Sequence, residues 1–159
     1  LAAVSSPTRA VFAGGSSDTG GQYEDHMEYI TIANTGNSTD FGNLSKGMIF
    51  QTAASSQTRG VFAGGQDYAV GNDADIDFIT IASTGNTTDF GDLTAHRDGA
   101  GGTGSQTRGV FAAGASSGNP INIIDYITFA SAGNATDFGD TTGIGRYVGA
   151  TSGAHGGIS

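Results

Sequence analysis

Three copies of one short motif recur along this chain at almost constant spacing. Residues 58–65 read TRGVFAGG, and close copies occur at residues 8–15 and 107–114. The arginines of the motif are separated by 50 and then by 49 positions, and they are Arg9, Arg59 and Arg108. A period of about 50 residues is typical of propellers, solenoids and other arrays, in which each repeat is one structural unit that packs on its neighbours.

Two further signatures recur in register with the first. One reads Thr-Asp-Phe-Gly and contributes the pairs Asp40 and Phe41, Asp89 and Phe90, and Asp137 and Phe138. The other is an aromatic-led run that begins at Tyr29, Phe78 and Tyr126. These landmarks predict a single repeat domain over residues 1–159, with repeats at approximately 1–50, 51–99 and 100–148 and the start of a fourth copy at 149–159.

The local patterns within a repeat predict strands rather than helices. Apolar residues never hold a 3.6-residue spacing over two turns, whereas the run that begins at Tyr29 alternates with the two-residue period of a strand. Glycine accounts for 28 of 159 residues. The strand before each repeated arginine consists largely of small residues, which suits strands whose backbones crowd around an axis. We therefore expect an all-β protein in which each repeat of about 49 residues forms a four-stranded sheet.

The charge balance argues against nucleic-acid binding and membrane insertion. The net charge is −9, and the six Lys and Arg residues occupy recurring places in the repeats, so no cations are left over to neutralise phosphates. Anionic membrane surfaces are disfavoured for the same reason, and no apolar run approaches the about 20 residues of a membrane-spanning helix. The sequence contains no cysteine, so it predicts neither disulfides nor thiolate metal sites.

The order of these features resembles the kelch repeat of β-propellers. A strand of small residues is followed by a short apolar strand ending in Gly-Gly, a variable loop, an aromatic-led strand, a Gly-Asn turn and an aromatic anchor. The third diglycine is replaced by Ala113-Gly114, and phenylalanine stands where many kelch blades have tryptophan. The amino-acid sequence of the motifs is similar to that of a kelch-like repeat variant in tail-fibre-like proteins of marine bacteriophages. The resemblance implies four-stranded propeller blades and a location on a virion or another extracellular surface.

Three repeats do not make a familiar ring, because propellers usually have four to eight blades. The chain is therefore expected to be part of a longer array, or half of a six-bladed ring formed by two chains. The alternative is a threefold β-prism or β-trefoil, since these folds also carry three internal repeats. The expected protein partners are copies of the chain itself or other virion or filament subunits.

The repeated arginines have two interpretations. Either they form a ring that binds a ligand, or each pairs with a repeated aspartate or with backbone carbonyls and so locks one sheet to the next. A residue repeated with the fold is expected to serve the fold, so we favour the structural interpretation. It covers Arg9, Arg59, Arg108, Asp40, Asp89, Asp137, Phe41, Phe90 and Phe138.

The segment between the second and third strands of each repeat varies in both length and chemistry. It spans residues 16–28, 66–77 and 115–125. Rigid scaffolds commonly carry binding residues on such loops, so we expect ligand recognition here through tyrosine faces and polar side chains. The candidate ligand-binding residues are Tyr23, Glu24, Asp25, His26, Tyr68, Asp73, Asp75, Asn119 and Asn122.

Three carboxylates alternate along the second variable segment, at Asp73, Asp75 and Asp77. Carboxylates at this density repel one another unless solvent or a hard cation screens them, and the spacing lacks the glycine and the terminal glutamate of an EF-hand loop. The segment is interpreted as a solvated acidic loop, with a calcium site as the alternative. No other cofactor is expected.

These features predict a non-enzymatic surface protein of the virion or tail-fibre type, which recognises a host-surface glycan or another cell-envelope component through its variable loops. The main alternative is a purely structural subunit of a fibre or extracellular filament, since exposed strand edges favour pairing between chains. A glycan hydrolase is a more distant alternative, because acidic residues are plentiful but nothing in the sequence singles out a catalytic pair.

Overall fold

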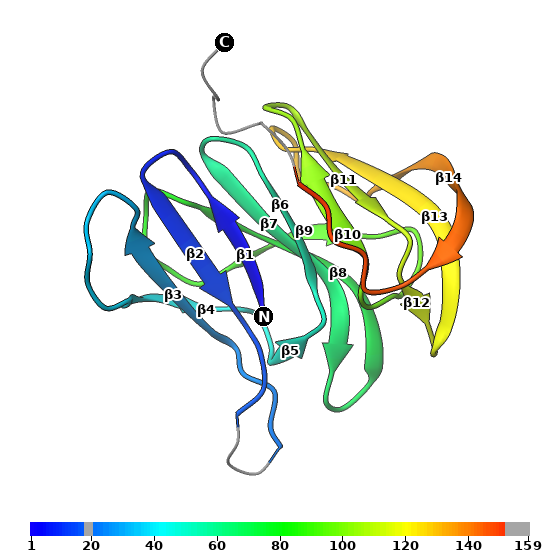
Figure 1. The fold of residues 1–159 in the computed structure, drawn as a ribbon, viewed down its shortest axis with the longest axis horizontal. Helices are drawn as coiled ribbons and strands as arrows, with labels where there is room; N and C mark the ends of the chain where they lie inside the picture. Colours follow the sequence, from blue (N-terminus) through cyan, green and yellow to red (C-terminus); the bar gives the residue numbers. More distant parts are fainter. Residues whose placement is uncertain (18–20, 152–159) are drawn as a thin grey trace.

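Antiparallel β-strands form the fold (Figure 1). The computed structural model describes residues 1–17 and 21–151. Within these ranges there are 14 strands in three sheets of four or five strands, and no helix. The all-β prediction is therefore confirmed. A helix with the length and hydropathy to cross a membrane is likewise not found among the described residues.

Each sheet is an antiparallel meander that follows the chain. The first consists of β1 (Ala2–Ser5), β2 (Arg9–Ala13), β3 (His26–Thr31) and β4 (Thr39–Asn43). The second consists of β6 (Thr52–Ser55), β7 (Arg59–Asp67), β8 (Gly71–Thr80) and β9 (Thr88–Asp92), and the short β5 (Met48–Ile49) also pairs with β7. The third consists of β10 (Gly101–Gly104), β11 (Arg108–Ala112), β13 (Asn119–Thr128) and β14 (Thr136–Gly145), and the short β12 (Ala115–Ser116) also pairs with β13.

The innermost strands of the three sheets, β1, β6 and β10, lie next to one another at the centre of the molecule (Figure 1). They consist of small residues because their backbones approach closely. A Cβ atom on Gly102 of β10 would overlap the backbone carbonyl of Ala53 in β6. Between β1 and β6, Ser55 Oγ donates a hydrogen bond to Ser5 O over 3.1 Å. Small side chains are thus a packing requirement of the central strands.

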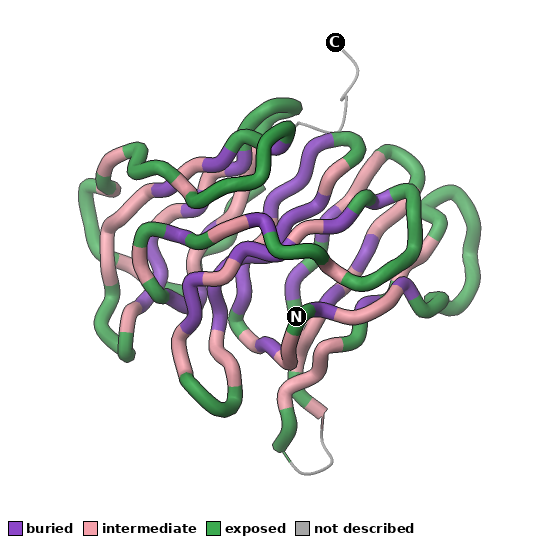
Figure 2. Tube along the Cα trace, turned by 180° about the vertical axis from the view of Figure 1, so that it is seen from behind, coloured by how far each residue is buried: buried purple, intermediate pink, exposed green. Residues whose placement is uncertain are grey.

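The hydrophobic core is divided into two clusters, one in each space between successive sheets. Side chains of a strand point alternately to its two faces, so the second sheet contributes to both clusters. The first cluster includes Val11, Met27, Phe41, Phe62, Ile79 and Ile81. The second includes Val61, Ile76, Phe90, Phe111, Ile127 and Phe129. Figure 2 shows the buried residues concentrated in the middle of the molecule, with exposed residues in the turns and toward its two ends.

Two of the three phenylalanine anchors are buried and the third is not. Phe41 and Phe90 are each 2 % exposed, whereas Phe138 is 58 % exposed. Phe138 is therefore not a buried anchor within the described chain. The physical reason is that Phe41 and Phe90 are each covered by the following sheet, and no further sheet covers Phe138 within the described part of the chain.

The diglycine positions adopt left-handed backbone conformations, as expected from their sequence. The φ angle is 57° at Gly64 and 107° at Gly65. At the third copy, Ala113 has a φ of 60° and Gly114 a φ of 103°. The bend is therefore kept where the first glycine has been replaced by alanine.

The start of the expected fourth copy runs beside the third sheet. Thr103 Oγ1 in β10 donates a hydrogen bond to Thr151 O over 2.8 Å. The rest of that expected copy, residues 152–159, lies outside the described residues.

Candidate functional site

The three variable segments emerge on the same side of the molecule, at its lower edge in Figure 1. They are the loop from β2 to β3, the β7–β8 hairpin, and the turn that contains β12. Each connects the second long strand of a sheet to the third, so the meander places all three connections at the same end of their sheets. We refer to residues 16–17, 21–26, 66–73 and 115–119 as the variable rim.

An aromatic pair joins the first and second segments of the variable rim. The rings of Tyr23 and Tyr68 meet edge to face with their centroids 5.6 Å apart. Tyr68 and Val70, at the tip of the β7–β8 hairpin, are 73 % and 74 % exposed. The tip is braced by Asp67, whose Oδ1 accepts hydrogen bonds from the backbone N–H groups of Ala69 and Val70 over 2.7 and 3.0 Å. The hairpin thus presents an aromatic and an aliphatic side chain to solvent on a supported turn.

A hydrogen bond and a groove join the second segment to the third. Asn72 Nδ2 donates to the backbone carbonyl of Ala115 over 3.0 Å. Beside this contact lies an open groove of about 680 Å³. Its lining residues are Val70, Gly71, Asn72, Asp73, His96, Ser116 and Ser117. The described part of the rim is therefore continuous across all three sheets.

The alternating carboxylates of β8 are engaged by the preceding repeat. Lys46 Nζ forms ion pairs with Asp73 and with Asp75, the latter over 2.6 Å. Asp77 Oδ2 accepts hydrogen bonds from Ser45 Oγ over 2.6 Å and from Thr87 Oγ1 over 3.0 Å. In the described residues no group of three or more His, Asp or Glu side chains is arranged to hold a metal ion. Lys46 therefore screens the charges of Asp73 and Asp75, whereas the sequence suggested screening by solvent or by a calcium ion.

The Lys46–Asp73 pair changes the acid–base properties of both residues. Burial disfavours the charged form of Asp73, but hydrogen bonds from Lys46 and from the backbone N–H groups of Asp75 and Ala74 outweigh it and lower its pKa. Burial likewise acts to lower the pKa of Lys46, and its hydrogen bonds with Asp73 and Asp75 raise that pKa above the ordinary value. The ion pair therefore favours the charged form of each partner.

The lowered pKa of Asp73 predicts an acid-sensitive contribution to stability. A carboxyl whose pKa is lower in the folded state stabilises the fold fully above its unfolded pKa, which is about 3.9 for aspartate. This contribution is lost as the pH falls below that value through the folded pKa. We expect the free energy of unfolding, measured by urea titration at a series of pH values, to fall less steeply below about pH 4 in Asp73→Asn than in the unaltered chain. If the free energy of unfolding falls equally steeply below about pH 4 in the two proteins, this role of Asp73 is contradicted.

The remaining candidate residues are distributed unevenly. Glu24 and Asp25 are half-buried, and their backbone carbonyls accept hydrogen bonds from the chain that follows β4, from Met48 N over 3.2 Å and from Leu44 N over 2.7 Å respectively. His26 is exposed at the start of β3, and Asn119 is exposed near Ser117 of the groove, to whose carbonyl its Nδ2 donates over 3.3 Å. The structure brings together Tyr23 with Tyr68 and Asp73 with Asp75. Asn122 is half-buried farther along β13 and does not line the groove.

The repeated arginines reach from one sheet to the next. Arg9 Nη1 donates to Ile81 O over 3.0 Å, and Arg59 Nη1 donates to Phe129 O. Each guanidinium also lies over the repeated aromatic ring in the third strand of its own sheet. The distance from the guanidinium carbon of Arg9 to the Tyr29 ring centroid is 4.2 Å, and Arg59 lies over Phe78 in the same way. The structural interpretation is thus supported for these two arginines, through carbonyl acceptors.

The repeated aspartates do not pair with the arginines. Asp89 Oδ1 and Asp137 Oδ1 instead accept hydrogen bonds from the backbone N–H groups of Gly91 and Gly139 over 3.1 and 2.9 Å. Arg9 and Arg59 therefore use backbone carbonyls, the second kind of partner that the structural interpretation included. The side chain and the backbone N–H two residues later are close enough to form a local turn, which satisfies the carboxylate within its own strand.

One buried ion pair was not predicted from the sequence. Arg97 Nη2 pairs with Asp125, and both side chains are fully buried. Arg97 Nη1 also donates to Ile123 O over 3.1 Å, and Thr94 Oγ1 donates to Asp125 over 2.7 Å. Burial lowers the pKa of Arg97, although Asp125 opposes this effect. The pair fixes the connection after β9 to β13 of the third sheet.

Six lining residues of the groove were also missed, namely Val70, Gly71, Asn72, His96, Ser116 and Ser117. His96 lies outside the variable segments, in the connection from β9 to β10. The two serines have no distinctive chemistry in a chain rich in small polar residues. Asn72, Ser116 and Ser117 do lie in variable segments, and Asn72 is also next to Asp73.

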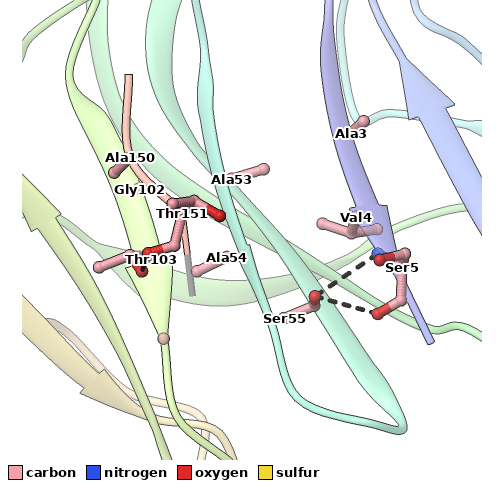
Figure 3. A pocket seen from close by; sticks show the side chains of 11 residues that line it. Ala3, Val4, Ser5, Ala53, Ala54, Ser55, Gly102, Thr103, Ala150 and Thr151 are labelled. Carbon is pink, nitrogen blue, oxygen red and sulfur yellow. Dashed lines mark hydrogen bonds between the residues drawn. The ribbon is translucent and has the colours of Figure 1, made fainter. Parts of the chain in front are cut away.

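The central strands enclose a second and smaller cavity of about 150 Å³ (Figure 3). Figure 3 shows Ser5 and Ser55 facing each other on one side of it and Thr103 beside Thr151 on the other. Its lining contains only small side chains, valine and threonine, without an aromatic or charged group. It offers neither a stacking surface nor a charge for recognition, so the variable rim is the better candidate site.

A scan of the chain against protein-family models finds no matching family, and a search among curated proteins finds no matching protein.

Proposed function

We propose that this chain is a non-enzymatic binding protein of a virion or other extracellular surface, built from kelch-like β-propeller blades, whose variable rim recognises a host-surface glycan or another cell-envelope component. The observation that carries the proposal is the separation of two sets of residues. Contacts between sheets are made mainly by residues that recur in the repeats, such as Arg9 and Phe41. Among the residues that differ between repeats, Tyr68 and Val70 are presented to solvent.

The blade interpretation is supported by the packing of the sheets. Each sheet is a meander whose innermost strand lies beside the innermost strands of the other sheets. The two hydrophobic clusters lie between successive sheets. This arrangement is typical of radially stacked blades, whereas the repeats of a β-prism or β-trefoil surround one shared core.

The chemistry of the variable rim suits a carbohydrate. Tyr68 offers an exposed ring that is steadied by Tyr23, and a ring of this kind packs on the apolar face of a sugar. Asn72, His96 and Ser117 supply donors and acceptors in the adjoining groove. An open groove that carries several polar side chains beside one aromatic platform favours an extended hydroxyl-rich ligand over a compact apolar one.

Glycan-array binding of the purified chain tests this proposal. We expect selective binding to a group of related glycans, and we expect Tyr68→Ala to weaken it about tenfold or more, because loss of a central aromatic contact commonly costs over 1 kcal/mol. Tyr147→Ala is the matched control. Tyr147 is also largely exposed, at 60 %, and also has an edge-to-face partner at 5.6 Å, but it belongs to no variable segment. Absence of selective binding, or an equal loss in both variants, would contradict the proposal.

A purely structural role is the second candidate. It is favoured by the exposed side chains on the outer faces of the two terminal sheets, represented by Ile32 and Phe138 at 51 % and 58 % exposure. The hydrolase alternative has less support, because Asp73 of the variable rim and the nearby Asp75 are both paired with Lys46. A hydrolase of the common types needs one carboxylic acid and one carboxylate across the scissile bond.

A further inference from the structure

Two contact regions between successive sheets are built from the same bonds. In the first, Gly85 N donates to Phe41 O over 2.7 Å and Thr87 N donates to Asn43 O over 2.9 Å. Asn43 N in turn donates to Asn86 Oδ1 over 3.0 Å. The Gly-Asn turn of one repeat thus binds the outer strand of the preceding repeat. We call such a contact region a joint. The preceding sheet is named its donor sheet, because its repeated arginine donates a hydrogen bond across the joint, and the following sheet is named its acceptor sheet. The names refer to this arginine contact and not to the backbone N–H groups.

The second joint repeats these bonds between the second and third sheets. Gly133 N donates to Phe90 O over 2.6 Å and Ala135 N donates to Asp92 O over 2.7 Å. Asp92 N donates to Asn134 Oδ1 over 3.2 Å. The same three hydrogen bonds therefore occur in both joints.

Two side-chain contacts also recur in both joints. The repeated arginine of the donor sheet binds a backbone carbonyl of the acceptor sheet, that of Ile81 or Phe129. A hydroxyl residue after the donor sheet binds a carboxylate on the third strand of the acceptor sheet. Ser45 Oγ donates to Asp77 over 2.6 Å, and Thr94 Oγ1 donates to Asp125 over 2.7 Å.

A glycine on the donor sheet gives the acceptor turn room to approach. A Cβ on Gly91 would lie 2.5 Å from the backbone carbon of Gly133, and a Cβ on Gly42 would meet Gly85 in the same way. Gly139, at the corresponding place in β14, has nothing within 4 Å of an added Cβ. Its φ is 133°, close to the 139° of Gly42 and the 140° of Gly91. The third sheet therefore keeps the shape of a donor sheet.

The rest of the donor surface is also present on the third sheet. Arg108 lies over the Tyr126 ring at 4.5 Å, as Arg9 lies over Tyr29, but its side chain is exposed. Phe138, which corresponds to Phe41 and Phe90, is exposed as well. The exposed Thr142 corresponds to Thr94. Further apolar side chains on this face, which correspond to buried residues of the second sheet, are the half-buried Val110, Ala112 and Ile124.

The first sheet presents the complementary acceptor surface. Ile32 corresponds to Ile81 and Phe129, which are 0 % and 4 % exposed, but is itself 51 % exposed. Glu28 corresponds to Asp77 and Asp125, and its carboxylate accepts a hydrogen bond from Ser38 Oγ over 3.0 Å, as Asp77 does from Thr87. The Gly-Asn turn of this repeat is at residues 36–37. Half-buried Phe12 and Ile30 complete the apolar part of this face.

We propose that the third sheet of one chain and the first sheet of a second copy form a joint of the same kind through their second, third and outer strands, in a head-to-tail arrangement. Arg108 of one copy binds the Ile32 carbonyl of the other, Phe138 is covered by Ile32, and Thr142 donates to Glu28. The exposed Arg146 follows the third sheet as Arg97 follows the second, so it adds a positive charge opposite Glu28. This contact differs from glycan recognition in its residues and lies away from the variable rim.

A head-to-tail contact has a characteristic response to mutation. Each copy contributes a different face, so a chain damaged on one face still has the other face intact. Phe138→Asp damages the donor surface and Ile32→Asp damages the acceptor surface. Both side chains are largely exposed within one chain, so the fold of each variant should survive, which circular dichroism and urea unfolding check.

Light scattering coupled to size-exclusion chromatography tests the proposal. We expect the unaltered chain to form a species of two or more copies, and we expect each variant alone to associate about tenfold more weakly or worse. An equimolar mixture of the two folded variants should form a two-chain species, since the acceptor face of Phe138→Asp meets the donor face of Ile32→Asp. Val70→Ser is the control, because it removes an equally exposed apolar side chain from the rim.

The proposal would be overturned by a monomeric unaltered chain at every concentration tested, by loss of association in Val70→Ser to the same extent as in the face variants, or by failure of the mixture to associate. Continued self-association of Ile32→Asp with loss only in Phe138→Asp would also overturn it, because it would show that two third sheets bind each other.

Discussion

Replacing Arg97 with alanine is expected to lower the free energy of unfolding by about 3–5 kcal/mol, because it leaves a buried carboxylate without its counter-charge. Arg97 and Asp125 are both fully buried and connect the segment after β9 to the third sheet. Thr94 still donates to Asp125 in the variant, but two neutral donors do not replace a positive charge in a buried site.

Urea unfolding followed by circular dichroism measures this effect, and the double variant Arg97→Met with Asp125→Leu is its control. Removing both charges eliminates the unpaired carboxylate, so the double variant should be more stable than Arg97→Ala. A loss below about 1 kcal/mol in Arg97→Ala would place the pair in the range of a surface ion pair and contradict its burial.

Gly91→Ala is expected to destabilise the chain by about 1–3 kcal/mol more than Gly139→Ala does, since the added methyl overpacks the contact with the third sheet. The two glycines have φ angles of 140° and 133°, so the conformational cost of replacing glycine is nearly the same at both. They differ in surroundings, because the new Cβ would lie 2.5 Å from Gly133 in one case and would meet nothing within 4 Å in the other.

The comparison is made by urea unfolding at concentrations where light scattering shows single chains, so that contacts between copies do not contribute. Gly42→Ala serves as a second test of the same point, because its Cβ would meet Gly85. Equal losses in Gly91→Ala and Gly139→Ala would show that backbone conformation alone, and not the approach of the next sheet, requires glycine in this motif.

The repeat pattern was sufficient to predict the strands and the role of two arginines. Motifs that recur at fixed spacing must serve the contacts that every repeat makes, so the small-residue strands and Phe41 could be assigned to packing. Phe138 has the same local sequence but is exposed. A side chain is buried by its neighbours in space, and the pattern within a repeat does not say whether a next sheet is present.

Contacts that depend on one side chain in another repeat could not be predicted. Asp73 and Asp75 looked like an isolated acidic loop because Lys46, their partner, is 27 positions before the nearer of them. Arg97 and Asp125 belong to different repeats, and no local motif in the sequence pairs them. Asn72 donates to the backbone carbonyl of Ala115. Every residue type has such a carbonyl, so this contact could not be predicted from the sequence.

The aromatic candidates of the rim were easier to identify than the polar ones. Large rings such as Tyr23 and Tyr68 are conspicuous in a chain of small residues, and the structure places them in contact. Ser116 and His96 became candidates only through the shape of the groove. Cavity shape arises from how the sheets pack, and it leaves no trace in the spacing of residues.

The division of each joint between two repeats has a consequence for how such genes can change. One repeat encodes a donor surface toward its successor and an acceptor surface toward its predecessor, as the second sheet shows with Arg59 and Ile81. An in-frame duplication of the DNA for that repeat would carry both surfaces together, and the new protein would need no compensating substitution to join its neighbours. Loops of the copied unit could then diverge independently, so the number of units and their ligand preferences can be inherited as separate traits.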